Sequence, residues 1–181
     1  MITDVFLHPG EYHFAHGPAK IQTILGSCVA FTMRDPLSGR AAMCHCLLPQ
    51  MPAEEKRNNS NSNMDIFRYV DTSFDAMLSE FQRYGVPPER LEIKLFGGAN
   101  VLLRMSKNLA IGSLNWQQAR QSLQKCKLGL RAHDIGGEAG RRLLFETATG
   151  EVFVKTLRVM TTFPPTLRTR GRAACLESVA Y

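Results

Sequence analysis

One amphipathic stripe among short strand-like segments is the feature that most constrains how this chain folds. Between residues 67 and 81, apolar residues recur at spacings of three and four, the pattern of a helix that rests one face on a core. The members of the stripe are Phe67, Val70, Phe74, Met77, Leu78 and Phe81. Gly85 and Pro87-Pro88 are expected to end this helix. A helix with one apolar face needs a partner layer, which the flanking segments supply.

The flanking segments are short β-prone runs bounded by glycine and proline turns. Strands are predicted over residues 21–25, 29–33, 40–48, 91–96, 128–132, 142–147 and 152–159. A second helix is predicted to begin at the capping-box pattern Asn115-Trp116-Gln117-Gln118 and to end near Lys127. Residues 50–63 contain little to bury and are predicted to form a mobile surface loop.

Two helices among these strands predict a single α+β domain over residues 1–181, with the helices layered on mixed β-sheet. Residues 160–181 are predicted to be a flexible tail of this domain. Hydrophobic residues make up 44% of the chain and charged residues 21%, which is ordinary globular usage and excludes a disordered or fibrous protein.

The sequence contains no apolar run near the roughly 18 residues of a membrane span. Its start, Met1-Ile2-Thr3-Asp4, lacks the basic-then-apolar order of a secretory signal. We therefore expect a cytoplasmic protein without membrane insertion. Five cysteines, an odd number, argue against a disulfide framework and leave free thiols, a metal site or a nucleophile as alternatives.

The segment Thr23-Ile24-Leu25-Gly26-Ser27-Cys28-Val29-Ala30 brings a strand into a Gly-Ser corner with a cysteine just beyond it. Glycine permits the sharp turn, and backbone N–H groups at such a corner lack ladder partners. Free N–H groups beside a nucleophile can form an oxyanion hole, so those of Ser27 and Cys28 are the predicted donors. The thiol must also be ionised to react, and a nearby imidazole is the usual means.

His45 is the predicted base. In a hairpin across residues 35–39, the run 29–33 pairs with about 41–45, which places His45 near the Cys28 end. The alternative interpretation is an inert buried thiol at Cys28 and a satisfied core histidine at His45.

A zinc site at Cys44-His45-Cys46 is disfavoured, because neighbours on a strand point to opposite faces of the sheet. No metal is therefore expected. The cysteines interpreted as core residues are Cys44, Cys46, Cys126 and Cys175.

Taken in order, these residues and several further segments resemble the CheD family of chemoreceptor glutamine deamidases. The Cys28 segment is followed by Asp35-Pro36 and by His45 with Leu47-Leu48-Pro49. The further matching segments are Phe67-Arg68-Tyr69-Val70-Asp71, Lys94-Leu95-Phe96-Gly97-Gly98-Ala99-Asn100, Ile111-Gly112-Ser113-Leu114-Asn115, the run from Asp134-Ile135-Gly136-Gly137 to Arg141, and Thr149-Gly150-Glu151-Val152. The resemblance covers about residues 8–159.

The resemblance implies a layered α/β sandwich like that of bacterial toxin deamidases, and a cysteine amidohydrolase without a cofactor. It implies Cys28 as the nucleophile, His45 as the base and Thr23 as the group that orients the imidazole. Protein glutamine would become glutamate through a thioester, with release of ammonia, and hydrolysis of glutamyl methyl esters is a related activity. Gly97, Gly98 and Asn100 are predicted to contact the substrate, with tight turns as the alternative role of the glycines.

The resemblance also implies two partners. These are the cytoplasmic helices of methyl-accepting chemoreceptors, as substrate, and a phosphatase of the CheC type. The alternative function is a non-enzymatic chemotaxis adaptor that binds a receptor or such a phosphatase.

The formal net charge of +6 is concentrated in one segment. Residues 101–133 hold six basic residues and no acid, and the rest of the chain balances at 16 of each sign. The six are Arg104, Lys107, Arg120, Lys125, Lys127 and Arg131. The segment is either a solvated helix face or a surface that steers acidic receptor helices toward the site. A nucleic-acid partner is not expected, because no recognition module or aromatic-plus-basic cluster accompanies the charge.

Overall fold

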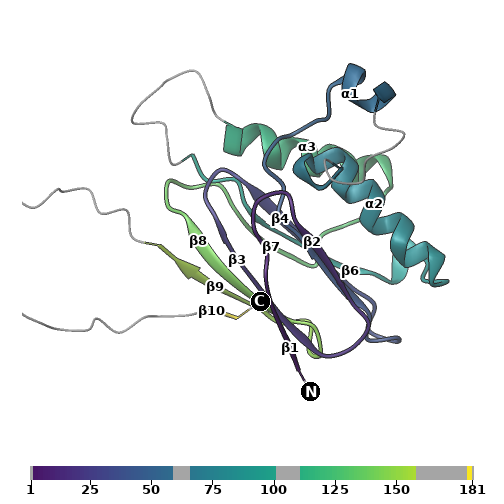
Figure 1. Ribbon diagram of the computed structural model, residues 1–181. Helices are drawn as coiled ribbons and strands as arrows, with labels where there is room; N and C mark the ends of the chain where they lie inside the picture. Colours follow the sequence, from purple (N-terminus) through teal and green to yellow (C-terminus); the bar gives the residue numbers. More distant parts are fainter. Residues whose placement is uncertain (1, 59–65, 101–110, 158–178, 181) are drawn as a thin grey trace, which may run out of the picture.

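The computed structural model describes residues 2–58, 66–100, 111–157 and 179–180. In this part of the chain, two five-stranded sheets stack on each other, and helices cover the outer face of one of them (Figure 1). The prediction of an α+β fold with mixed sheets and two main helices is thereby confirmed.

Sheet A has the strand order β1-β3-β8-β9-β10. Its strands are β1 (Thr3–Phe6), β3 (Ala19–Leu25), β8 (Arg141–Glu146), β9 (Val152–Thr156) and β10 (Val179–Ala180). β1 runs parallel to β3, and the other neighbours are antiparallel. Buried and more exposed residues alternate along β3 and β8, because only one face of sheet A is turned to the core.

Sheet B has the strand order β2-β5-β4-β6-β7. Its strands are β2 (Tyr12–Ala15), β5 (Ala41–Cys44), β4 (Val29–Arg34), β6 (Glu92–Gly97) and β7 (Ala132–Ile135). The residues of β4, β5 and β6 are buried almost throughout, since sheet B lies between sheet A and the helices. Burial on both faces explains why these runs are continuously apolar in the sequence.

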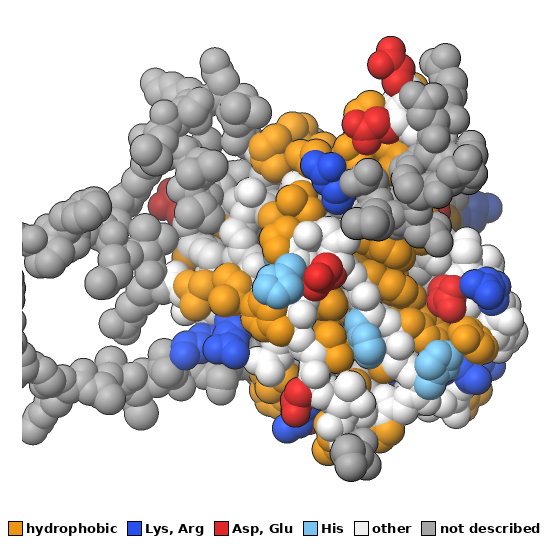
Figure 2. All heavy atoms as spheres, in the orientation of Figure 1, with side chains coloured by type: hydrophobic (Ala, Val, Ile, Leu, Met, Phe, Trp, Pro, Cys, Tyr) orange, Lys and Arg blue, Asp and Glu red, His pale blue; other side chains and the backbone are white. Residues whose placement is uncertain are grey.

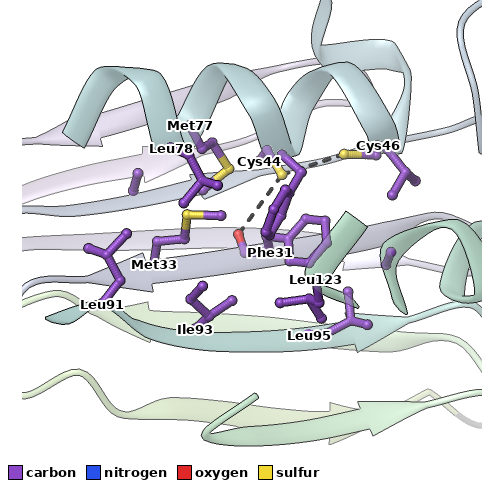
Figure 3. Packing of buried hydrophobic residues seen from close by; sticks show 14 of the residues in the cluster. Phe31, Met33, Cys44, Cys46, Met77, Leu78, Leu91, Ile93, Leu95 and Leu123 are labelled. Atoms are coloured by element: carbon purple, nitrogen blue, oxygen red, sulfur yellow. Dashed lines mark hydrogen bonds between the residues drawn. The ribbon is translucent and has the colours of Figure 1, made fainter. Parts of the chain in front are cut away.

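The helices α2 (Val70–Arg83) and α3 (Ile111–Lys125) pack against each other on sheet B. The predicted stripe faces the sheet, since its members from Val70 to Phe81 are buried. Figure 3 shows Met77 and Leu78 of α2 over the strands that carry Phe31 and Met33. α2 ends before Gly85, as predicted, and the short 3-10 turn η3 (Pro88–Arg90) leads into β6.

A second apolar cluster fills the space between the two sheets. Sheet A contributes Ile21, Leu25, Leu143, Phe145, Val152 and Val154, and sheet B contributes Ala30, Ala41, Met43 and Phe96. The molecule therefore has three layers in the order helices, sheet B, sheet A, with one apolar cluster at each of the two junctions.

Three predicted strands differ clearly from the structure, and the bounds of the other predicted strands agree within two residues. β5 ends at Cys44 rather than residue 48, and beyond it only isolated bridges of Cys46 and Leu48 continue the pairing. The strand expected over 128–132 is instead β7, which begins at Ala132. β9 ends at Thr156, and residues 158 and 159 of that predicted strand lie outside the described residues. The pattern also missed β1, whose residues are mostly exposed and show no alternation.

The predicted capping box at residue 115 is wrong. α3 begins at Ile111, and Asn115 is fully buried within the helix. Gly112 permits this earlier start, because a Cβ there would collide with the carbonyl oxygens of Gly98 and Ala99. The helix could not approach those carbonyls with any other residue at that position.

The loop predicted over 50–63 contains the short helix α1 (Ala53–Asn58), so this prediction is wrong for those residues. Two contacts hold α1 against the start of α2. Tyr69 Oη donates to Glu55 Oε2 at 2.7 Å, and Lys56 Nζ lies 2.7 Å from Asp71 Oδ2. Residues 59–63 lie outside the described part of the chain.

The cysteines divide by burial. Cys44 and Cys46 are buried between α2 and sheet B as predicted, with their Sγ atoms 3.4 Å apart (Figure 3). Cys126 is exposed just after α3, so its interpretation as a core residue is wrong. Cys175 lies outside the described residues, and of the tail 160–181 only Val179–Ala180 are described, as β10.

The basic segment contributes four described basic residues, which are all exposed: Arg120, Lys125, Lys127 and Arg131. Arg104 and Lys107 lie outside the described residues. On the face seen in Figure 2, charges of both signs are scattered among apolar side chains. In the described chain, every helix is too short or too polar to cross a membrane.

Candidate active site

The Gly26-Ser27-Cys28 turn carries the chain from β3 of sheet A to β4 of sheet B. Cys28 is partly buried, and it packs against the cluster between the two sheets. The predicted corner therefore lies at one end of the space between the sheets, where a thiol is half-sheltered from solvent.

All three carbonyl oxygens of this turn accept hydrogen bonds from residues that follow β6 or lie in α3. Ala99 N donates to Gly26 O at 2.9 Å, Asn115 Nδ2 to Ser27 O at 2.9 Å, and Gly98 N to Cys28 O at 2.8 Å. The peptide bonds of this turn are trans, so each carbonyl points opposite to the N–H group that follows it. The N–H groups of Ser27 and Cys28 are thus turned away from these donors.

These two N–H groups are open in the described structure. No carbonyl oxygen of a described residue accepts a hydrogen bond from Ser27 N or Cys28 N, although the Cys28 N–H does contact its own thiol. The next N–H along, of Val29, bonds Cys46 O at 3.0 Å and so belongs to the sheet. Both predicted donors are therefore available to a ligand, and their role as an oxyanion hole stays a prediction.

Gly97 and Gly98 pack against the carbonyl side of the Cys28 turn. Gly97 has φ 104° and Gly98 has φ 67°, a region that favours glycine, and a Cβ at Gly97 would collide with the Cys28 carbonyl oxygen. Both glycines are buried. Asn100 Nδ2 donates to Ser113 Oγ of α3 at 3.1 Å. A contact of these three residues with substrate stays a prediction.

His45 follows the last residue of β5, and the N-terminal segment holds its main chain. Gly10 N donates to His45 O at 2.8 Å, and His45 N donates to Glu11 O at 2.9 Å. The side chain is almost fully buried, with 2% exposed. The alternation along β5 places His45 on the same face as Met43, toward sheet A, as the sequence predicts.

Cys28 and His45 are diagonal neighbours on that face. Val29 and Cys46 form an antiparallel bridge, so Cys28 lies opposite Leu47 and His45 opposite Ala30. The predicted register is therefore displaced by one residue, yet it brings the two side chains to the same end of the sheet. Diagonal pairs on one face lie within reach of long side chains.

Thr23 fixes the tautomer of His45. Its Oγ1 lies 2.8 Å from His45 Nδ1 and 2.8 Å from the carbonyl oxygen of Leu7. A carbonyl can only accept, so the single hydroxyl proton goes to Leu7 and Thr23 accepts from Nδ1–H. Neutral His45 therefore carries its lone pair on Nε2, a buried atom without a hydrogen-bond partner in the described structure.

Burial sets the charge of both groups. Burial raises the pKa of the Cys28 thiol, against a smaller lowering by its own N–H. Burial also lowers the pKa of His45 to about 4, although the Leu7 carbonyl and the Glu11 carboxylate act to raise it. At neutral pH the pair is an uncharged thiol and an uncharged imidazole. Such an imidazole can take the thiol proton as the sulfur attacks.

The structure thus brings together Thr23, Ser27, Cys28 and His45, which were selected from the sequence. It adds Asn115, whose amide bonds both Ser27 O and Leu47 O at 2.9 Å. Sequence reasoning missed this role because the residue fitted a helix cap. Among the described residues, no group of three His, Cys, Asp or Glu side chains is placed to hold a metal ion.

A sheltered thiol, an imidazole oriented by a hydroxyl and two open N–H groups form an arrangement typical of cysteine-dependent hydrolases. Comparison with known proteins agrees with this class. A family model described as CheD chemotactic sensory transduction matches residues 47–156. The chain belongs to the CheD family.

Individual relatives match over most of their length. A probable chemoreceptor glutamine deamidase CheD 2 from Geobacter sulfurreducens is 45% identical over 153 residues, which cover 84% of this chain and 89% of the relative. A probable chemoreceptor glutamine deamidase CheD from Maridesulfovibrio salexigens is 42% identical, over 86% of this chain and 93% of the relative. A protein of the same name from Thermococcus kodakarensis is 36% identical, over 79% of this chain and 86% of the relative.

Proposed function

We propose that this protein deamidates specific glutamine side chains of chemoreceptors, converting them to glutamate. The observation that carries the proposal is the imidazole of His45, held by Thr23 through Nδ1 with Nε2 unpartnered, on the same face of sheet B as Cys28. The relatives, which are named as chemoreceptor glutamine deamidases, supply the substrate class.

The reaction begins when Cys28 Sγ attacks the carboxamide carbon and its proton passes to His45 Nε2. The carbonyl oxygen becomes an oxyanion, which accepts hydrogen bonds from the N–H groups of Ser27 and Cys28. Collapse of this intermediate breaks the C–N bond, and ammonia leaves with the proton from His45. The product of this half-reaction is a thioester on Cys28.

Water completes the reaction. His45 removes a proton from the attacking water, a second tetrahedral oxyanion forms in the same hole, and its collapse expels the Cys28 thiolate. The thiolate recovers the proton, and the glutamate side chain is released. A glutamyl methyl ester presents the same carbonyl with methanol as leaving group, so the same residues would hydrolyse it.

The low pKa of His45 makes the first proton transfer unfavourable in the resting site. Thr23 orients the ring but carries no negative charge to stabilise the imidazolium that forms. The main electrostatic stabilisation in this mechanism therefore comes from the oxyanion hole, where hydrogen bonds strengthen as the charge develops.

The proposed substrate sets the surroundings in which the protein acts. Receptor methylation helices are cytoplasmic, so we place the protein in the cytoplasm, and the family resemblance adds a CheC-type phosphatase as a further partner. An adaptor without enzymatic activity would bind the same receptors and leave their glutamines unchanged.

The test is mass spectrometry of receptor cytoplasmic fragments after incubation with wild type, Cys28→Ala or Cys126→Ser. Wild type and Cys126→Ser are expected to add about one dalton per converted glutamine and to release ammonia, while Cys28→Ala gives neither. The exposed Cys126 provides the matched control for loss of a thiol. Equal conversion by Cys28→Ala, or receptor binding by wild type without any conversion, would refute the proposal, and the second result would favour the adaptor.

A further inference from the structure

Asn115 connects the two halves of the site through one nitrogen atom. It is fully buried in the second turn of α3, and Nδ2 donates to Ser27 O, before the nucleophile, and to Leu47 O, after the base. Both protons of the amide group are thereby used. These two acceptors also fix the orientation of the amide, because the flipped form would set oxygen against oxygen.

The two acceptors differ in what else holds them. Next to Leu47 O, the N–H groups of Leu47 and Leu48 both donate to Arg68 O, at 2.9 and 3.0 Å. The main chain of His45 is held separately by Gly10 and Glu11. The base segment therefore keeps its position without Asn115.

The Ser27–Cys28 peptide is held at its flanks, where Ala99 N and Gly98 N donate to the carbonyl oxygens of Gly26 and Cys28, but its own carbonyl depends on Asn115. Among the described residues, Asn115 is the only donor to Ser27 O. The same planar peptide carries the Cys28 N–H on its opposite side. Without the amide, this peptide unit can rotate, and the Cys28 N–H then no longer points to where the oxyanion forms.

The unused atom of the amide also indicates a functional role. Asn115 Oδ1 is buried and has no hydrogen-bond partner in the described structure. An unsatisfied buried acceptor destabilises a fold, so the amide is kept here for the two carbonyl oxygens that its nitrogen satisfies. Such exceptions are expected where a residue serves a site rather than stability.

We propose that Asn115 is a positioning residue that aims the Cys28 N–H into the oxyanion hole. The proposal rests on the proposed deamidase activity and deepens it. It predicts that Asn115 matters for reactions that form an oxyanion and matters little for reactions of the thiol that form none.

Two reactions of Cys28 separate these cases. Deamidation of a receptor fragment passes through a tetrahedral oxyanion. Alkylation by iodoacetamide displaces iodide at a saturated carbon and needs only the thiol and its base. We would measure kcat and KM for the first, and the alkylation rate of the Cys28 peptide by mass spectrometry for the second. The variants are Asn115→Ala, Asn115→Asp and the control Ser122→Ala, which changes a buried polar residue of the same helix.

Asn115→Ala is expected to lower kcat about 10- to 100-fold with little change in KM, while alkylation changes less than about threefold. Asn115→Asp places a carboxylate against two carbonyl oxygens, and its protonated form restores one donor. Its kcat relative to wild type should therefore rise as the pH is lowered from about 8 to about 5.5. Ser122→Ala is expected to match wild type in both reactions.

An equal fall of both reactions in Asn115→Ala, together with a lowered melting temperature, would show that Asn115 only maintains the fold. An unchanged kcat would also overturn the proposal. Failure of the deamidase function itself gives a different result, because wild type would then convert no glutamine while Cys28 still reacts with iodoacetamide.

Discussion

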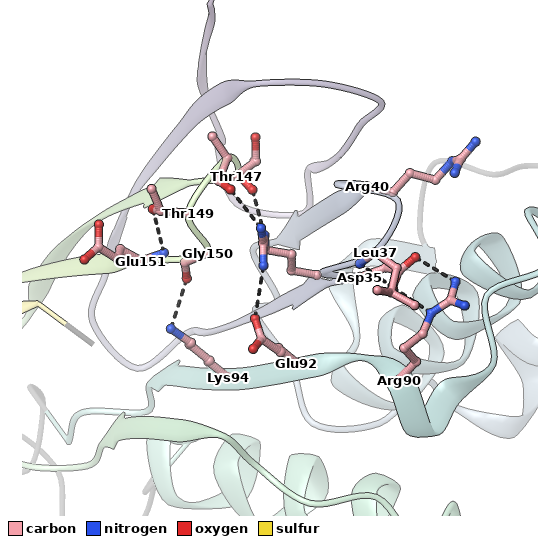
Figure 4. Close-up of polar contacts among 12 residues, drawn as sticks. Asp35, Leu37, Arg40, Arg90, Glu92, Lys94, Thr147, Thr149, Gly150 and Glu151 are labelled. Carbon is pink, nitrogen blue, oxygen red and sulfur yellow. Dashed lines mark hydrogen bonds and ion pairs between the residues drawn. The ribbon is translucent and has the colours of Figure 1, made fainter.

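β4 is bounded by two polar corners that treat their hydrogen-bonding groups in opposite ways. At the corner after the strand, Asp35 is fully buried and both of its carboxylate oxygens are bonded (Figure 4). Arg90 donates to Oδ1 at 2.7 Å and to Oδ2 at 2.8 Å, and Leu37 and Ser38 donate as well. At the corner before the strand, the carbonyls are bonded, but the N–H groups of Ser27 and Cys28 and the Nε2 of His45 are left open.

The two ends of this six-residue strand therefore have different roles: one corner stabilises the fold, and the other leaves groups open for a reaction. Burial acts to raise the pKa of Asp35, but the bonds from Arg90, Ser38 and Leu37 outweigh it and hold the pKa at about 2. The carboxylate is thus charged at all working pH values and stabilises the turn. The groups at the Cys28 corner are neutral and unpaired, so they are available to a substrate. Four experiments test this contrast.

The largest expected effect is the loss of stability in acid that His45 causes. Its pKa is about 4 in the folded state and near 6.5 when unfolded, so between these values only the unfolded chain takes up the proton. The contribution of His45 to the free energy of unfolding is complete above pH 6.5. It falls by about 3 kcal/mol as the pH drops to 4, and it does not change further below that pH. Urea denaturation across this range should show a steeper decline for wild type than for His45→Gln. Parallel curves for the two proteins would contradict the assignment.

A substitution at the Asp35 corner should lower the stability of the protein without lowering its activity. Asp35→Asn is expected to lower the free energy of unfolding at neutral pH by about 2 kcal/mol, because Arg90 keeps its charge without a buried carboxylate. The matched control is Glu92→Gln, which removes a more exposed partner of Arg34 at 3.4 Å and should cost less than about 1 kcal/mol. Denaturation measures both, with deamidation assayed well below the melting temperature. A lowered kcat for Asp35→Asn would mean that the two corners are coupled.

Thr23→Val should have the converse effect, lowering turnover more than stability. Without the hydroxyl, the ring loses the acceptor that lies 2.8 Å from Nδ1 and orients it. We expect kcat to fall about tenfold, equal to about 1.4 kcal/mol, and Thr23→Ser to restore most of it. Steady-state ammonia release measures the three proteins. If Thr23→Ser is as slow as Thr23→Val, orientation by the hydroxyl is not the cause.

The smallest effect concerns the exposed basic residues of α3, far from either corner in sequence. Reversing Arg120 and Lys125 to glutamate should slow conversion of a receptor fragment about two- to threefold at low salt. The difference should vanish at high salt, because screening removes long-range attraction. Initial rates at the two salt concentrations provide the measurement. Equal rates at low salt would identify this surface as a solvated helix face.

The sequence was sufficient for those parts of the site that depend on local periodicity. The alternation along residues 41–45 predicts that His45 shares a face with Met43, and the turn at Asp35 predicts the hairpin that brings His45 to the Cys28 end, although the register of the hairpin is displaced by one residue. The stripe of α2 was equally readable, since burial of one face imposes spacings of three and four. In each case the signal is carried by neighbours in the chain.

The parts that failed depend on contacts between distant segments. α3 includes Gly112, which packs against the carbonyls of Gly98 and Ala99 in a close approach that no local pattern records. Asn115 fits the local pattern of a helix cap. Its actual role was not visible in the sequence, because its two acceptors lie 88 and 68 residues away in the chain. The packing of Gly97 and Gly98 against the Cys28 turn was likewise not visible in the sequence, and their contact with substrate stays a prediction.

The bond from Thr23 to the carbonyl of Leu7 has a practical consequence for anyone handling the protein. Leu7 follows β1, an edge strand held by parallel pairing to β3. If β1 detaches, Thr23 regains its proton, can donate it to Nδ1, and leaves His45 with the wrong nitrogen free. A purification tag or fusion joined ahead of β1 can therefore silence a preparation whose Cys28 is intact, so activity should be compared after the tag is removed.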